Sequence, residues 1–179
     1  MKIIGVTGMP GSGKGIVAGV SRNLGYDVVR MGDVIRGEAQ KRDASIGETA
    51  IQLREEYGEF IVAEKCILKV KELLNLNGNN SKVVIEGIRS PYEVDIFKRN
   101  FKEFKVISVQ SSPETRFNRL LGRKRVDDSN IKSEFLKRDK RELKFGIGAV
   151  IATADYTVVN EGSKKRLINI IRSILTNEM

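Results

Sequence analysis

Apolar side chains gather in five short runs along the chain, with helix-like spacing between the runs. The runs cover residues 2–8, 26–31, 82–87, 104–110 and 155–159. The first run ends in glycine, as expected of a strand that is buried on both faces of a sheet. Strands that alternate with helices predict an α/β fold with a parallel sheet.

A long amphipathic helix is predicted from residue 60 to the Asn-Gly pair at 77–78. Apolar side chains recur there at steps of three and four, at Ala63, Ile67, Val70 and Leu74, so that one stripe faces the core. Cys66 lies beside this stripe, and we expect it to be a small buried side chain rather than a nucleophile.

Two further helix starts are marked by serine followed by proline. Ser90 and Ser112 are the expected N-caps, and Glu93 completes a capping box with Ser90. A last helix, from about residue 163, carries an apolar face that needs a sheet to cover it.

The composition narrows the kind of protein and its chemistry. With 179 residues, 40% apolar and 31% charged, the chain fits one globular domain over residues 1–179. No apolar run approaches the ~20 residues that span a bilayer, and no signal-peptide pattern is present, so we expect a cytoplasmic protein without a membrane partner. One Cys and no His exclude a disulfide framework, the usual zinc ligands and Ser-His or Cys-His nucleophile pairs. Chemistry must therefore use Lys, Arg, Asp, Glu and backbone groups.

The charge balance points to an anionic partner. Lys plus Arg exceeds Asp plus Glu by 32 to 23, which gives a net charge of +9. Such a balance favours a nucleotide, a nucleic acid or a membrane surface. Residues 116–144 hold 11 Lys or Arg and 5 Asp or Glu, so most of the excess lies in one segment.

The strongest motif is a glycine-rich loop between the first strand and the following helix. Glycines let the backbone curl with positive φ, so that its N–H groups converge on an anion at a helix N-terminus. Lys14 then reaches the β- and γ-phosphates as a point charge, although Gly15 stands where a P-loop usually has Ser or Thr. The predicted ATP-phosphate ligands are Gly8, Met9, Pro10, Gly11, Ser12, Gly13, Lys14, Gly15 and Ile16.

This form of the loop resembles the adenylate kinase branch of the P-loop nucleotide kinases, and the closest likeness is to an archaeal group related to those enzymes. The resemblance covers nearly the whole chain, and it implies a five-stranded parallel sheet of order 2-3-1-4-5 flanked by helices. It also implies transfer of the ATP γ-phosphoryl group to AMP or a similar acceptor, with Mg²⁺. Those enzymes usually have Thr where this chain has Ile16. Because both hydroxyl positions are empty, a metal would be held by phosphates, by waters and by carboxylates acting through water.

The acceptor residues follow from the same resemblance. Gly32, Asp33 and Arg36 match the family's Gly-Asp-apolar-apolar-Arg segment, in which the arginine binds the acceptor phosphate. Asp33 would also act on Mg²⁺ through water. The helical segment of about residues 32–76 would form the acceptor-binding insertion.

The end of the third strand supplies further candidates. Glu86 stands where the family has Asp and would hold metal-bound water, while Gly87 and Arg89 would contact the acceptor phosphate. Glu93 falls where adenylate kinases carry an adenine-reading Gln, but it also completes a capping box. The two roles of Glu93 compete, so the identity of the base stays open.

The basic segment resembles a short lid of about residues 119–141. Arg119 and Arg123 match the family's Arg-x-x-Gly-Arg, and Arg125 begins an Arg-x-Asp-Asp segment. Together with Arg138 and Lys14, these arginines are the expected catalytic groups, because phosphoryl transfer relies on alignment and positive charge. Asn160, Glu161 and Gly162 resemble the loop that holds adenine through backbone contacts.

Two alternatives remain open beside the nucleoside monophosphate kinase. The first is a small-molecule kinase of the same fold, such as one acting on dephospho-coenzyme A. The second is a non-enzymatic ATP-binding module that uses its basic face on nucleic acid, which is less favoured because few exposed aromatic residues accompany the basic clusters.

Overall fold

The computed structural model describes residues 2–77, 81–122 and 131–177. A five-stranded parallel sheet forms its centre, and the strand order β2-β3-β1-β4-β5 confirms the order expected from the resemblance. The strands are β1 (Lys2–Thr7), β2 (Asp27–Arg30), β3 (Lys82–Ile88), β4 (Lys105–Gln110) and β5 (Tyr156–Val159).

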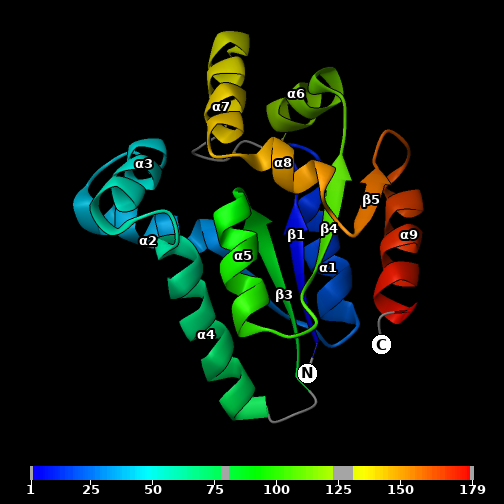
Figure 1. The fold of residues 1–179 in the computed structure, drawn as a ribbon. Coiled ribbons are helices and arrows are strands. Elements are labelled where there is room, and N and C mark those ends of the chain that lie inside the picture. The colour runs from blue at the N-terminus through cyan, green and yellow to red at the C-terminus, as the bar shows by residue number, and fades with distance from the viewer. Residues whose placement is uncertain (1, 78–80, 123–130, 178–179) are drawn as a thin grey trace.

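Helices cover both faces of the sheet (Figure 1). Apolar residues of α1 and α9 pack on one face, and those of α4, α5 and α8 pack on the other. In Figure 1, α6 and α7 stand beyond the carboxyl end of β4. The helices are α1 (Lys14–Asn23), α2 (Met31–Arg42), α3 (Ile46–Tyr57), α4 (Ile61–Asn77), α5 (Pro91–Asn100), α6 (Pro113–Leu121), α7 (Lys132–Lys144), α8 (Ile147–Ala152) and α9 (Lys164–Asn177).

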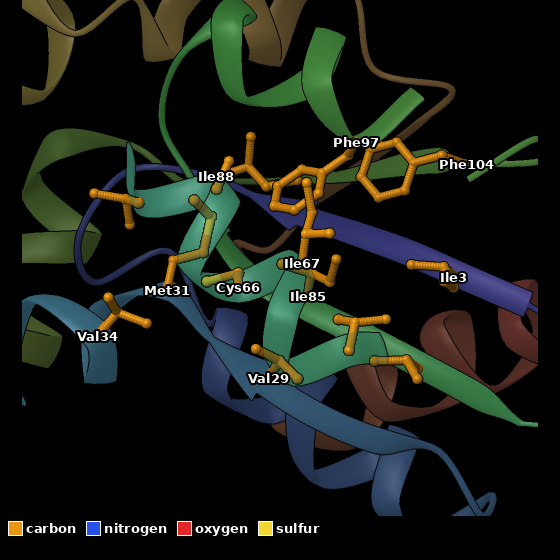
Figure 2. Close-up of a cluster of buried hydrophobic side chains, with 14 of the residues drawn as sticks. Ile3, Val29, Met31, Val34, Cys66, Ile67, Ile85, Ile88, Phe97 and Phe104 are labelled. Carbon is orange, nitrogen blue, oxygen red and sulfur yellow. The ribbon is translucent and has the colours of Figure 1, made fainter. Parts of the chain in front are cut away.

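The central strands are buried on both faces, as their apolar runs predict. Ile3 and Ile85 face the cluster beneath α4 and α5, while the adjacent Ile4 and Val84 face the cluster beneath α1 and α9. Figure 2 shows Ile85 and Ile67 with the rings of Phe97 and Phe104 in the first cluster. Among the described residues, no helix is long and apolar enough to cross a membrane.

Cys66 lies in the core, as the helical stripe predicts. The thiol is fully buried, and burial raises the pKa of Cys66 to about 12. At neutral pH the thiol therefore stays protonated, which makes it a poor nucleophile.

The predicted helix starts are confirmed in detail. Ser90 Oγ accepts a hydrogen bond from the Glu93 amide at 3.2 Å, and Ser112 Oγ accepts one from the Thr115 amide at 3.3 Å. The predicted second strand was one residue too long at each end, and at its C-terminal end the reason is that the buried Met31 already begins α2.

The Phe97 side chain should carry a large share of the packing between α5 and the sheet. It is fully buried, with its ring centroid 5.3 Å from that of Phe104. We expect Phe97→Ala to lower the free energy of unfolding by ~3–5 kcal/mol, because a cavity replaces the ring. Urea denaturation would measure the loss. Leu76→Ala serves as the control, since Leu76 is 80% exposed, and an equal loss in both variants would contradict the assignment.

Candidate functional site

The glycine-rich loop of residues 8–16, called the phosphate loop below, makes a tight turn. Two of its positions need glycine. Gly8 has φ 141° and Gly13 has φ 109°, which other residues rarely adopt. A Cβ on Gly8 would also lie 2.2 Å from the carbonyl oxygen of Val109, and one on Gly13 would lie 2.4 Å from Asn160 Nδ2. The loop is therefore packed against the ends of β4 and β5. No side chain caps the start of α1 at Gly13, so the first amides of the helix are open to an anion.

Lys14 folds back over this loop. Its Nζ donates to the carbonyl oxygens of Gly8 and Met9, the latter at 3.1 Å. Loss of surrounding water lowers the pKa of Lys14 to about 8, with a smaller lowering from Arg89 and opposing effects from Glu86 and Glu142. An anion bound beside Lys14 would favour its charged form and raise this pKa.

A cavity of about 300 Å³ opens over the loop at the carboxyl ends of the strands. This is where parallel α/β sheets bind their ligands. The loop contributes Gly8, Pro10, Gly11, Gly13, Lys14, Gly15 and Ile16. Charged side chains from other elements line the remaining wall, namely Arg30, Arg36, Glu86, Arg89, Arg119, Arg138 and Glu142.

Most of the predicted acceptor residues meet at this cavity. Gly32, Arg36, Gly87 and Arg89 line it, although they come from two separate segments of the chain. Asp33 does not line it. Its carboxylate is about half exposed and accepts a hydrogen bond from Arg36 on the same helix.

Glu93 lies away from the cavities, and its carboxylate is occupied by structural contacts. The residue is fully buried, and Oε2 accepts hydrogen bonds from the amides of Arg89 and Ser90 at 2.6 and 3.2 Å. Oε1 accepts from Arg54 at 2.8 Å. The Arg54 guanidinium in turn lies 4.3 Å from the ring centroid of Phe145. Of the two roles open to Glu93, the structure shows the capping one.

A second cavity of about 360 Å³ adjoins the first between α2, α3 and α7. Gly32, Arg36, Arg89, Arg138 and Glu142 line both cavities, so the two share a wall. The start of α3 and Arg141 are found only in the second cavity. Sequence reasoning missed both Glu142 and Arg141, because they lie in a charge-rich helix whose spacing does not distinguish inward from outward positions.

Arg116 ties the phosphate loop to α7. Its guanidinium makes two hydrogen bonds to the Asp139 carboxylate, at 2.9 and 2.6 Å, and donates to the carbonyl oxygen of Pro10 at 3.1 Å. Arg116 is only 3% exposed. The sequence placed it in the basic cluster without a role, and the signal for that role was the acidic Asp139 between Arg138 and Lys140.

Arg119 is hydrogen-bonded to the predicted adenine loop of residues 160–162. Arg119 donates to Ser111 Oγ and to the carbonyl oxygen of Asn160, both at 2.9 Å. The Asn160 side chain donates to the carbonyl oxygen of Ser12 at 2.8 Å, and Glu161 accepts from Thr115 Oγ1 at 2.6 Å.

Asn160, Glu161 and Gly162 line neither cavity, and Gly162 is exposed. Arg123 and Arg125 lie outside the described residues.

The described residues offer few ligands to a metal ion at the first cavity. In the described part of the chain, no three Asp, Glu or Cys side chains converge on one point. Glu86 lines the cavity, with Arg30 Nε 3.1 Å from its Oε2. Glu86 is thus a residue that could hold a Mg²⁺ ion through water.

The Arg116–Asp139 pair should stabilise the protein only as a complete pair. We expect Arg116→Met to lower the free energy of unfolding by ~3–5 kcal/mol, because it leaves a largely buried carboxylate without its partner. The double variant R116M/D139L should recover most of this loss. Chemical denaturation of both variants would measure the two effects. If the double variant were no more stable than the single one, the loss would not come from an unpaired charge.

Comparisons with known proteins agree with the fold described above. A family profile described as "AAA domain" matches residues 7–134. A "UPF0200 protein" of Methanothermobacter thermautotrophicus is 53% identical over 178 residues, which cover 97% of this chain and 91% of that protein. A shikimate kinase from Bacteroides thetaiotaomicron superposes with a TM-score of 0.64 at 19% identity, covering 98% of each chain. A gluconokinase from Sinorhizobium meliloti gives 0.63 at 14% identity, covering 98% of this chain and 92% of that one.

The two structural likenesses, at their low identities, establish the fold. The profile matches more than half of the chain, and the Methanothermobacter relative is similar over nearly all of it. The chain therefore belongs to the archaeal UPF0200 family and has the fold of the P-loop kinases.

Proposed function

We propose that this protein is an ATP-dependent phosphotransferase that moves the γ-phosphoryl group of ATP to AMP or a similar small acceptor. The observation that carries the proposal is the single cavity in which Lys14 and its loop face Arg36 and Arg89. A donor phosphate chain on the loop and an acceptor beside these arginines would meet within that cavity. Such positioning is the larger part of catalysis in phosphoryl transfer.

The donor side of the proposal rests on the loop. Its amides and the start of α1 would bind the β- and γ-phosphates, and Lys14 would exchange its contacts with Gly8 and Met9 for phosphate oxygens. Arg119 and Arg138 line the same cavity and would stabilise the charge that develops on the transferred group. Mg²⁺, when bound, neutralises part of the phosphate charge.

Two classes of molecule are candidates for the acceptor. A nucleoside monophosphate follows from the family resemblance, with its phosphate on Arg36 and Arg89. A hydroxyl-bearing small molecule is the second candidate, because Glu93, at the position that would read a base, is fully buried and committed to Arg54. The solved kinases that share this fold are named for shikimate and for gluconate, and this also supports the second candidate.

The non-enzymatic nucleic-acid module is less well supported. Part of the basic excess of residues 116–144 is turned inward, since Arg116 is buried and Arg119 and Arg138 line the cavity. An enclosed cluster of cations suits the phosphates of a small ligand better than a polynucleotide, which needs an open basic surface.

Lys14→Ala should lower ATP turnover by about 10²-fold or more, because a positive charge next to the transferred phosphoryl group is lost. A coupled assay of ATP consumption with AMP, other nucleoside monophosphates, shikimate and gluconate would measure this and would also identify the acceptor class. Lys144→Ala is the matched control, since Lys144 is exposed at the end of α7. A Lys14→Ala protein with the full rate would refute the role of Lys14.

Binding of ATP should take up protons near pH 8. Free Lys14 has a pKa of about 8, and contact with phosphate favours its charged form and so raises that pKa. At pH 8 we expect uptake of about half a proton per site, falling toward zero well below that pH, where Lys14 is already charged. Calorimetric titration in two buffers of different ionisation enthalpy measures the uptake. Equal apparent enthalpies in the two buffers at pH 8 would contradict the expectation.

A further inference from the structure

We infer that Glu142 accepts the proton of an acceptor hydroxyl group, and that the acceptor is therefore an anionic alcohol. This inference rests on the proposed phosphotransferase and chooses between its two acceptors. Glu142 lies on α7, is 2% exposed and lines both cavities at their junction. Glu142 belongs neither to the phosphate loop nor to the predicted acceptor residues.

Within the described residues, one carboxylate oxygen of Glu142 makes no hydrogen bond. Oε2 is buried and accepts no hydrogen bond from the part of the chain that the structure describes, although Arg89 Nε lies 3.2 Å away as an ion-pair partner. A buried acceptor atom without a hydrogen bond is costly, so a ligand that donates one is favoured there. A hydroxyl group supplies this donor. A phosphate dianion has no proton to donate, and the carboxylate would repel it.

The other nearby carboxylates are less suited to the task. Asp33 lines neither cavity, and Glu93 has both oxygens occupied. Glu86 lines only the first cavity and faces the phosphate loop, where it is proposed to act on Mg²⁺ through water. Glu142 alone of these four borders both the donor cavity and the acceptor cavity.

The second cavity would hold the rest of the acceptor. Its wall combines cationic side chains with the apolar Ile35, Ile46 and Ala50. A small molecule with a hydroxyl group toward Glu142 and an anionic group toward Arg36, Arg138 and Arg141 matches this lining in charge.

The proposed step is balanced. The acceptor O–H bond breaks, and its proton passes to Glu142 Oε2. The acceptor oxygen forms a bond to the γ-phosphorus, while the bond from that phosphorus to the β–γ bridging oxygen breaks and its electron pair leaves with ADP. The other charged residues that line the two cavities with Glu142 are Lys14, Arg30, Arg36, Glu86, Arg89, Arg119, Arg138 and Arg141.

Glu142→Gln tests the inference, with Glu134→Gln on the exposed side of the same helix as the matched control. The probes are ATP hydrolysis, in which water takes the hydroxyl position, and ATP turnover with gluconate, shikimate or AMP. We expect Glu142→Gln to lower kcat by ~10²–10⁴-fold, to leave the KM for Mg·ATP unchanged, and to remove the acidic limb of the pH–rate profile. A purely structural role would alter the melting temperature or KM and would keep that limb.

Other outcomes separate this inference from the function on which it rests. Formation of ADP from ATP plus AMP at an unchanged rate in Glu142→Gln would overturn the inference and leave the phosphotransferase standing. A Glu142→Gln protein that keeps the wild-type rate, or the acidic limb of the pH–rate profile, with a hydroxyl-bearing acceptor would likewise overturn the inference. A wild-type protein that binds no ATP, or binds it without turnover in any of these assays, would overturn both.

Discussion

The close packing of the phosphate loop between the ends of β4 and β5 is the constraint on which the site depends. The loop must leave β1 at Gly8 beside the carbonyl of Val109 and enter α1 at Gly13 beside Asn160. Because neither position has room for a Cβ, the loop amides are fixed without any ligand. A preorganised anion site of this kind needs little rearrangement when phosphate arrives, which is the usual source of electrostatic stabilisation in transfer reactions.

Charged side chains surround the cavity over the phosphate loop. The first cavity gathers six cationic side chains and two carboxylates from the described residues, so a positive excess faces any ligand. Close ion pairs, Arg30 with Glu86 and Arg89 with Glu142, allow some of these arginines to stay partly buried. Among the described residues, Lys14 Nζ contacts the backbone carbonyls of Gly8 and Met9 rather than a carboxylate. Burial lowers the pKa of Lys14, and the negative charges of Glu86 and Glu142 oppose that lowering only in part.

The sequence predicted the features that local rules determine. Strand positions follow from short apolar runs, the starts of α5 and α6 follow from Ser-Pro pairs, and the loop follows from glycine spacing around Lys14. The contacts that it missed join residues far apart, such as Arg54 with Glu93 across 39 positions and Arg116 with Asp139 across 23. No local pattern distinguishes a buried arginine from a solvated one in a basic helix, so the family resemblance implied a lid but not which side chains of α7 turn inward.

The same reasoning explains why the fold identifies the donor better than the acceptor. The donor site is built by one continuous segment, from Gly8 to Ile16, whose residue types are dictated by backbone geometry. The proposed acceptor cavity is assembled from α2, the start of α3, the residue after β3 and α7, which are separate segments of the chain. In this chain α7 places the buried carboxylate of Glu142 at the junction of the two cavities. In the segment after β3, the carboxylate of Glu93 accepts a hydrogen bond from Arg54. Under the proposed function, both features would alter what an acceptor must offer, and neither would alter how the loop binds phosphate.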